Sequence, residues 1–399
     1  MAVWKLYPIL RYAVTAAAQN VTGLTIVINN SLARQLFSGS LVVLVLAWAY
    51  SISSDVTIQN TLSYSFRNIG VVPVPPEHAG RDAGFSGMLQ GRSVWVFDDT
   101  FLPRPASDGL QWRSSSWSWT KDTSSEDGIG PFHHALDEEG LAIQLLPHTS
   151  KEAAFNIAHV CGGREWGTQG CGSRLTPWPH SIVVDHGGQK GVIYYNNMQI
   201  GPGGQWDFRV ISGSVATWSD PELPAERVEP PLFSDEEPDW GSAAVLVDKD
   251  IYVYACEFNG KSKPCLLARV PFHSATEKQH YRYWAGKGEW SKDWRDAIPI
   301  FEGESIFSVH YNAYLKKFLA FYMPGLTNEI VFRTTDLPQG PWSDPYNVGK
   351  GLPASENWDY ALNAHPEFSR ENGRIEILSY IRPVGFLRQD TQLIELRFD

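Results

Sequence analysis

Charged residues are scarce in this chain, and so are cysteine and methionine. Only 19% of the 399 residues are charged, and just four are cysteine. Sparse charge combined with 43% hydrophobic and 13% aromatic residues excludes an intrinsically disordered protein, a collagen and a coiled coil. The net charge is −11 and no arginine-rich stripe is present. We therefore expect no nucleic-acid partner, because a phosphate backbone binds basic surfaces.

The abundant residues are those that favour strands and tight turns. The chain has 16 Trp, 16 Tyr, 34 Gly and 26 Pro. This composition favours many short strands joined by turns over long helices. It predicts an all-β protein.

The first 54 residues differ from the rest. They contain Lys5, Arg11 and Arg34 but no acidic residue, and Leu41–Tyr50 is uninterrupted apolar sequence. The apolar segment, about residues 36–52, lies in length between a signal-peptide core and a membrane-spanning helix. The basic flank favours a cytoplasmic N-terminus. We interpret residues 1–54 as a signal-anchor or a signal peptide, with a mitochondrial presequence or a misassigned gene start as alternatives.

This interpretation predicts the compartment and the domain organisation. The protein would be extracellular, or anchored to a membrane through the apolar segment with its globular part outside the cytoplasm. Residues 55–77 would form a linker, and residues 78–399 would form the folded domain.

The four cysteines fall in two close pairs. Cys161 and Cys171 flank a Gly-rich loop, and Cys256 and Cys265 flank the polar segment EFNGKSKP. Two local disulfides are the simplest pairing, and they agree with export. Zinc is less favoured, because neither pair has the short spacing of a metal knuckle. We expect no cofactor, with a structural calcium ion as the alternative.

A repeat of strand pairs runs through residues 78–399. Each unit has a strand of small residues, a turn, and then an aromatic-rich apolar strand. The first strands are AGFSGML (83–89), WPHSIVV (178–184), WGSAAVLV (240–247), IFSVHYNAY (306–314) and YALNAHPEF (360–368). The second strands are RSVWVFDD (92–99), GVIYYNN (191–197), DIYVYAC (250–256), KFLAFYM (317–323) and RIEILSY (374–380). A third element recurs as TWSD (217–220), EWSKDW (289–294) and PWSDP (341–345).

The five units predict a five-bladed β-propeller. A β-sandwich is the competing all-β fold, but its strands recur without such a repeat of units. In a propeller the first strand of each blade lines a central funnel, so the strands of small residues should carry the site.

Two aspartates of the first unit face each other if its turn falls at Gln90–Gly91. With Leu89 opposite Arg92, antiparallel pairing places Asp82 directly opposite Asp99. Like charges at such positions destabilise a sheet, so the pair points to function. Two facing carboxylates can divide their pKa values, as the acid and the base of glycosidic hydrolysis require. A turn-capping Asp82 with a solvated Asp99, or a shared calcium ion, is the alternative.

Six segments of the chain resemble the DUF4185 family. They are RDAGFSGMLQGRSVWVFDDTFL (81–102), WPHS (178–181), WGSAAVLVDKDIYVYAC (240–256), SVHYNAYLKKFLAFY (308–322), RTTDLPQGPWSDP (333–345) and AHPEF (364–368). The family includes endo-D-arabinanases of glycoside hydrolase family 183. The resemblance implies hydrolysis of a furanosyl polysaccharide, with Asp82 and Asp99 as the catalytic pair. The chain departs from the family pattern at Asp98, where the family has glycine; in a regular strand Asp98 would point to the opposite face.

Further candidate residues lie on or beside the predicted inner strands. Those expected to hydrogen-bond sugar hydroxyls or to stack on sugar rings are Trp178, His180, Asp239, Trp240, His310, Asn312 and His365. Arg81 would hold one carboxylate ionised, and Glu257 is a reserve acid. For each of them a core or turn role is the alternative. The three histidines could instead bind a metal, although no spacing supports this.

These observations favour a glycoside hydrolase that cleaves a furanosyl, D-arabinan-like polysaccharide or glycan by acid/base catalysis with an aspartate pair. The alternative is a non-catalytic propeller that binds a carbohydrate or a surface and has lost turnover, which the departure at Asp98 favours. A third class is a metal-dependent hydrolase or lyase that uses the histidines.

Overall fold

The computed structural model describes residues 62–399 except 127, 166, 204–206, 326, 356–357 and 386–387. The predicted leader, residues 1–54 with its apolar segment, lies outside the described residues. Within the described part, no helix is long and apolar enough to cross a membrane.

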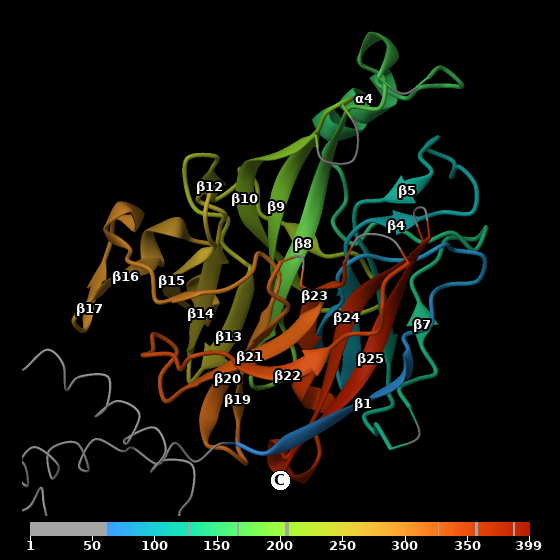
Figure 1. The fold of residues 1–399 in the computed structure, drawn as a ribbon. Helices are drawn as coiled ribbons and strands as arrows, with labels where there is room; N and C mark the ends of the chain where they lie inside the picture. The colour runs from blue at the N-terminus through green and yellow to red at the C-terminus, as the bar shows by residue number, and fades with distance from the viewer. Residues whose placement is uncertain are drawn as a thin grey trace, which may run out of the picture. The chain divides into compact units, whose positions relative to one another are not determined.

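Five antiparallel sheets follow one another along the chain (Figure 1). The first contains β2 (Phe85–Leu89), β3 (Arg92–Phe97), β6 (Ser116–Thr120) and β7 (His133–His134). The second contains β8 (Arg174–Val184), β9 (Gly191–Ile200), β10 (Phe208–Trp218), β11 (Glu226–Arg227) and β12 (Phe233–Ser234). The third contains β13 (Ala243–Val247), β14 (Asp250–Cys256), β15 (Pro264–Pro271), β16 (Arg282–Gly286), β17 (Glu289–Ser291) and β18 (Phe301–Glu302).

The remaining sheets complete the fold. The fourth contains β19 (Ser308–Asn312), β20 (Lys317–Tyr322), β21 (Glu329–Thr335) and β22 (Tyr346–Lys350). The fifth contains β23 (Tyr360–Ala364), β24 (Ile375–Gly385), β25 (Arg388–Phe398) and β1 (Tyr64–Val71). A small extra sheet pairs β4 (Thr100–Phe101) with β5 (Trp112–Arg113).

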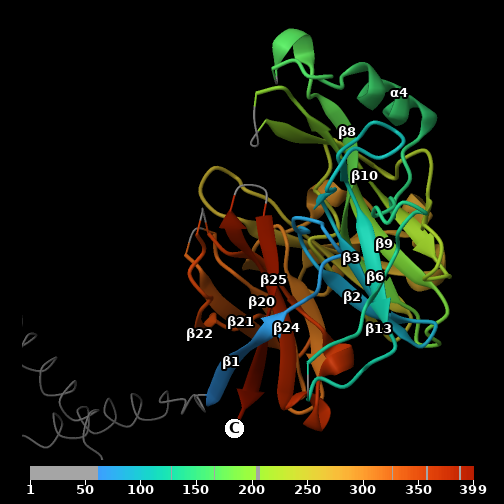
Figure 2. The same cartoon turned by 90° about the vertical axis from the view of Figure 1, so that its right-hand side faces the viewer.

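The five sheets are arranged in a ring. Their first strands contact one another in the order β2, β8, β13, β19 and β23. Ser86 of β2 and His365, directly after β23, close the ring with a hydrogen bond of 2.6 Å between Oγ and Nδ1. Buried apolar clusters fill each interface between neighbouring sheets. The fold is mostly β and propeller-like, and all five predicted strand pairs are confirmed. The sheets of the two chain halves lie on opposite sides in Figure 2.

The third recurring element is not structurally equivalent in the three units. TWSD falls at the end of β10, EWS forms β17, and PWSDP lies between β21 and β22. The shared Trp-Ser pair therefore does not mark one repeated strand.

Strand β1 differs from the expected linker over residues 55–77. It pairs antiparallel with β25, with Tyr64 opposite Phe398. Asp399 N–H also donates to the Ser63 carbonyl at 3.0 Å. A search for local repeats could not reveal this strand, because its partner β25 lies at the other end of the chain.

The helix α4 (Ser150–Ala158) was also not predicted. Thr149 and Glu152 form a capping box that satisfies the first backbone N–H groups. Asn156 fixes the helix to β8, because its side-chain amide donates to the Leu175 carbonyl and accepts from the Leu175 N–H, at 2.9 and 2.7 Å. Strands β8, β9 and β10 extend from the body of the molecule toward α4 (Figure 1).

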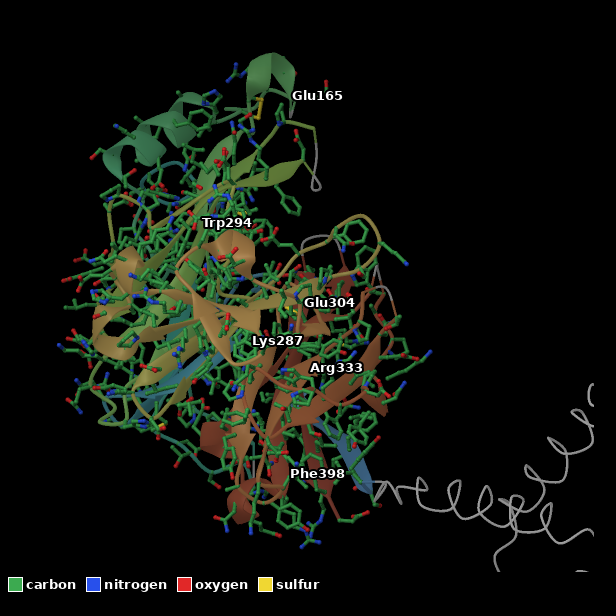
Figure 3. All side chains as sticks on the ribbon, turned by 90° about the vertical axis from the view of Figure 1, so that its left-hand side faces the viewer. Glu165, Lys287, Trp294, Glu304, Arg333 and Phe398 are labelled. Carbon is green, nitrogen blue, oxygen red and sulfur yellow. A yellow bond between two sulfur atoms is a disulfide. The ribbon has the colours of Figure 1, made fainter. Side chains whose placement is uncertain are left out.

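Both predicted disulfides are present. Cys161 and Cys171 close the loop that contains Glu165, which lies at the far end of the molecule from Phe398 (Figure 3). Cys256 and Cys265 join directly opposite positions of β14 and β15. These two side chains are buried within the apolar cluster between the third and fourth sheets.

We expect the double variant Cys256→Ala/Cys265→Ala to lose about 2–3 kcal/mol of unfolding free energy, because a disulfide restricts the unfolded chain. Urea unfolding followed by tryptophan fluorescence would measure the change. The matched variant Cys161→Ala/Cys171→Ala opens a loop outside the core clusters, so its loss should be smaller. Equal losses would contradict the assignment of the Cys256–Cys265 bridge to the core.

Candidate active site

The hairpin of β2 and β3 brings aspartates together where β2 begins and β3 ends. Beyond the hairpin, Arg81 pairs with Thr100 in the same register. Asp82 N–H donates to the Asp99 carbonyl at 3.0 Å. Asp82 and Asp99 therefore occupy the opposed positions that the hairpin arithmetic predicts, and both side chains are partly exposed.

Asp98 lies close to this pair, which corrects the expectation that it points away. Its N–H donates to the Asp82 carbonyl at 3.0 Å. Burial, followed by the charges of Asp82 and Asp99, raises the pKa of Asp98 well above its usual value. The regular ladder is interrupted here, because Asp98 and Asp99 both bond the backbone of Asp82, so that two residues oppose one as in a β-bulge. Asp98 is 6% exposed, and its Oδ1 has no hydrogen-bond partner among the described residues.

Asp99 is held by a cation and an indole. Arg174 Nη2 lies 3.0 Å from Asp99 Oδ2, and Trp178 Nε1 donates to Asp99 Oδ1 at 3.2 Å. The Arg174 guanidinium is itself stacked on Trp112, 3.7 Å from the ring centroid. Burial raises the pKa of Asp99, while Arg174 and Trp178 oppose that rise. Of the three aspartates, Asp99 is therefore the one whose carboxylate is best stabilised by its neighbours.

Asp82 has a different environment. Burial is the main cause that raises its pKa to about 6, and the charge of Asp99 adds to the rise. The Ala83 N–H, which donates to Oδ1 at 2.7 Å, and the Tyr360 hydroxyl oppose it. The two opposed carboxyls therefore differ in how well their charged forms are stabilised, because Asp99 contacts the cation Arg174 and Asp82 does not.

Arg81 does not have the expected role as the partner of a carboxylate. Its Nη1 donates to Ser118 Oγ at 2.6 Å, and its guanidinium lies 4.4 Å from the ring centroid of Phe97. Arg81 is 1% exposed, and burial lowers its pKa to about 9. The expectation was wrong because Arg81 faces the interior of the first sheet, and Arg174 takes the place next to the acid.

His310, Asn312 and His365 belong to a buried network between sheets. His310 Nε2 lies 3.0 Å from Glu376 Oε1, and Asn312 Nδ2 donates to the same oxygen. His365 contacts Ser86 and also Ser379, and it stacks on Trp95. Burial and His310 lower the pKa of His365 to about 3.

These residues therefore have the core role that was the alternative. A three-histidine metal site is not formed either, because the described part of the chain contains no group of three residues able to hold a metal ion.

Among the candidates near the second and third sheets, Trp178 contacts Asp99, and the others have different partners. His180 Nε2 lies 3.2 Å from Asn196 Nδ2, and burial lowers the pKa of His180 to about 4. Trp240 is fully buried against Tyr283, so its ring is not available to a sugar. The reserve acid Glu257 accepts from the N–H of Asp239. Burial and then Glu257 raise the pKa of Asp239 to about 7.

Sequence reasoning missed Arg174, Tyr360 and Trp112. Arg174 begins β8 and precedes Trp178 by four positions, so the two share one face of the strand. That spacing could have indicated from the sequence that Arg174 lies beside Trp178. Tyr360 is the first residue of β23, and its contact with Asp82 joins the fifth sheet to the first.

The family comparison matches residues 79–378 to DUF4185, described as a domain of unknown function. This chain belongs to the DUF4185 family. No curated protein matches it in sequence. The DUF4185 match includes the aspartate pair and the residues that contact it, namely Asp82, Asp99, Arg174, Trp178 and Tyr360.

Several solved structures are similar to this DUF4185 domain. A candidate hydrolase from Bacteroides ovatus has 14% identity and a TM-score of 0.51, covering 83% of this chain and 87% of that one. A GH43_1 enzyme from Xanthomonas citri has 15% identity and a TM-score of 0.47, covering 82% and 90%. Zg3597, a family 117 glycoside hydrolase of Zobellia galactanivorans, has 11% identity and a TM-score of 0.46, covering 84% and 90%. At 14% identity, the likeness to the Bacteroides ovatus structure concerns the fold alone.

Proposed function

We propose that this DUF4185 protein is a five-bladed β-propeller glycoside hydrolase that cleaves a furanosyl, D-arabinan-like polysaccharide or glycan. The observation that carries the proposal is the opposed pair Asp82 and Asp99, partly exposed and held in unlike environments. Glycosidic hydrolysis needs two carboxyl groups with different roles. The resemblance to arabinanases of the family supports the sugar class, and the two disulfides support action outside the cytoplasm.

In this proposal Asp99 is the base or nucleophile and Asp82 is the general acid. Arg174 and Trp178 stabilise the Asp99 carboxylate, so that it can accept a proton from water or attack the anomeric carbon. Asp82 has a pKa of about 6, so it can carry a proton to the leaving oxygen near neutral pH. The Tyr360 hydroxyl orients the Asp82 carboxyl.

Asp98 is compatible with this mechanism despite the glycine in the family. Burial and the neighbouring charges raise the pKa of Asp98 well above its usual value, which favours its neutral form. In that form it adds no charge beside Asp99. The second candidate is a propeller that binds a carbohydrate without cleaving it. The buried carboxyl of Asp98, which replaces a glycine of the family pattern, favours this candidate.

The experiment that tests the proposal is a hydrolysis assay of the full chain on D-arabinan, L-arabinan, galactofuranan and xylan. We expect new reducing ends from a furanosyl polymer only, and their loss in both Asp82→Asn and Asp99→Asn. Binding of one polymer without turnover would replace the hydrolase with the binding propeller. Activity that persists in both variants would overturn the assigned pair.

Asp82→Asn should also stabilise the protein at pH 7. The folded-state pKa of Asp82 is raised to about 6. Its contribution to stability is therefore present below the unfolded pKa and is lost as the pH rises through about 6. Asparagine cannot ionise, so we expect a gain of about 1–3 kcal/mol at pH 7 and a smaller one at pH 4.5. Urea unfolding at both pH values measures this, and a loss of stability at pH 7 would contradict it.

A further inference from the structure

A pocket of about 370 Å³ lies beside the proposed reaction centre. Its walls come from the loop that leads into β5, from α4, from the Cys161–Cys171 loop and from the start of β8. The lining residues that bear on its function are Leu110, Trp112, His148, His159, Arg174 and Thr176.

Arg174 connects this pocket with the aspartate pair. It lines the pocket, and its Nη2 also lies 3.0 Å from Asp99 Oδ2. Trp112, on which the guanidinium stacks, lines the pocket as well. A polymer chain cleaved at Asp99 would therefore reach the pocket with its neighbouring units.

Two polar groups of the pocket walls lack a partner. Arg174 Nε and Thr176 Oγ1 are buried and have no hydrogen bond within the described chain. Thr176 is only 2% exposed. Buried polar groups are almost always paired in proteins, so such groups in a pocket wall call for a ligand or water. Asn156 is not such a group, because its amide is bonded to the backbone of Leu175.

The chemistry of the walls fits a sugar. Apolar surface with a few fixed polar groups is typical of small-molecule sites, and it suits a saccharide ring, which has C–H faces and hydroxyl edges. Trp112, with one face covered by the Arg174 guanidinium, supplies aromatic surface, and Arg174 and Thr176 are polar side chains of the same wall. We propose that this pocket is a saccharide subsite that binds units of the substrate next to the cleaved bond. This inference rests on the proposed function.

The test compares two variants of the pocket on D-arabinan fragments of two lengths, a disaccharide and an octasaccharide. Leu110→Trp fills the pocket, and Thr176→Val removes the unpaired hydroxyl without changing the shape. We expect the KM for the octasaccharide to rise about 10-fold for Leu110→Trp and about threefold for Thr176→Val, with kcat unchanged. The matched controls are Leu337→Trp, at an exposed position, and Thr217→Val; both should behave as wild type.

Calorimetric binding in the Asp82→Asn background gives a readout that does not depend on turnover. The same variants should weaken octasaccharide binding by the same factors. Turnover with no difference between variants and controls overturns the subsite and leaves the hydrolase. Binding that depends on Leu110 and Thr176, without turnover by the wild type, supports the subsite and overturns the hydrolase. If neither fragment binds or is cleaved, both proposals fail.

Discussion

Asp99→Asn is expected to lower kcat by about 10³-fold while the protein stays folded. The amide has nearly the shape of the carboxylate but cannot accept a proton from water or form a bond to the anomeric carbon. Arg174 would then lose its ionic partner, while Trp178 could still donate to the amide oxygen. Initial rates on the furanosyl polymer that the wild type cleaves measure the effect, and near-UV circular dichroism verifies the fold.

Asp98→Asn is the matched control for this prediction. The same chemical change is made at the neighbouring residue, where burial raises the pKa and favours the neutral form of the carboxyl. We expect its kcat to stay within about threefold of the wild type. If Asp98→Asn lost as much activity as Asp99→Asn, the role of Asp99 would have to be shared with Asp98 and the proposed assignment would be wrong.

Arg174→Met is expected to lower kcat/KM by about 10²-fold. The cation that opposes the raised pKa of Asp99 is then gone, and burial raises that pKa further. Because the base must be ionised, the acid limb of the pH–rate profile should move to higher pH. The measurement is the pH dependence of kcat/KM for the wild type and the variant.

Arg92→Met is the control for the loss of an arginine. Arg92 pairs with Glu222, whose side chain is 60% exposed, and such pairs contribute little. Its pH profile should match that of the wild type. A loss of activity in Arg174→Met without any movement of the acid limb would mean that Arg174 has only a packing role.

The ring of sheets could be predicted because each unit is local. The turn after Leu89 sets the register of β2 and β3, and the alternation of small and aromatic residues identifies the strands. The opposition of Asp82 and Asp99 follows from the same local arithmetic. Strand β1 could not be predicted in this way, since it pairs with β25 at the other end of the chain.

The residues that surround the aspartates were harder to predict from the sequence, because they belong to other sheets. Arg174 reaches Asp99 across 75 positions of sequence, and Tyr360 reaches Asp82 from the fifth sheet. The position of Asp98 depends on an irregular pairing in which Asp98 and Asp99 both bond the backbone of Asp82, which the residue types do not suggest. His310 and His365 were over-interpreted, since His365 bonds Ser86 and Ser379 within the core through its two ring nitrogens, and His310 bonds the buried Glu376 through Nε2.

The pairing of β1 with β25 also determines how the molecule would sit on a support. Residue 63 and residue 399 are hydrogen-bonded to each other, so the start of β1 and the end of β25 lie side by side at one end of the fifth sheet. Phe398 lies at the opposite end of the molecule from Glu165, whose loop leads into Arg174 (Figure 3). Immobilisation through the C-terminus would therefore hold the Cys161–Cys171 loop and the start of β8 on the outward side, where a polymer too large to diffuse beneath the molecule could reach them.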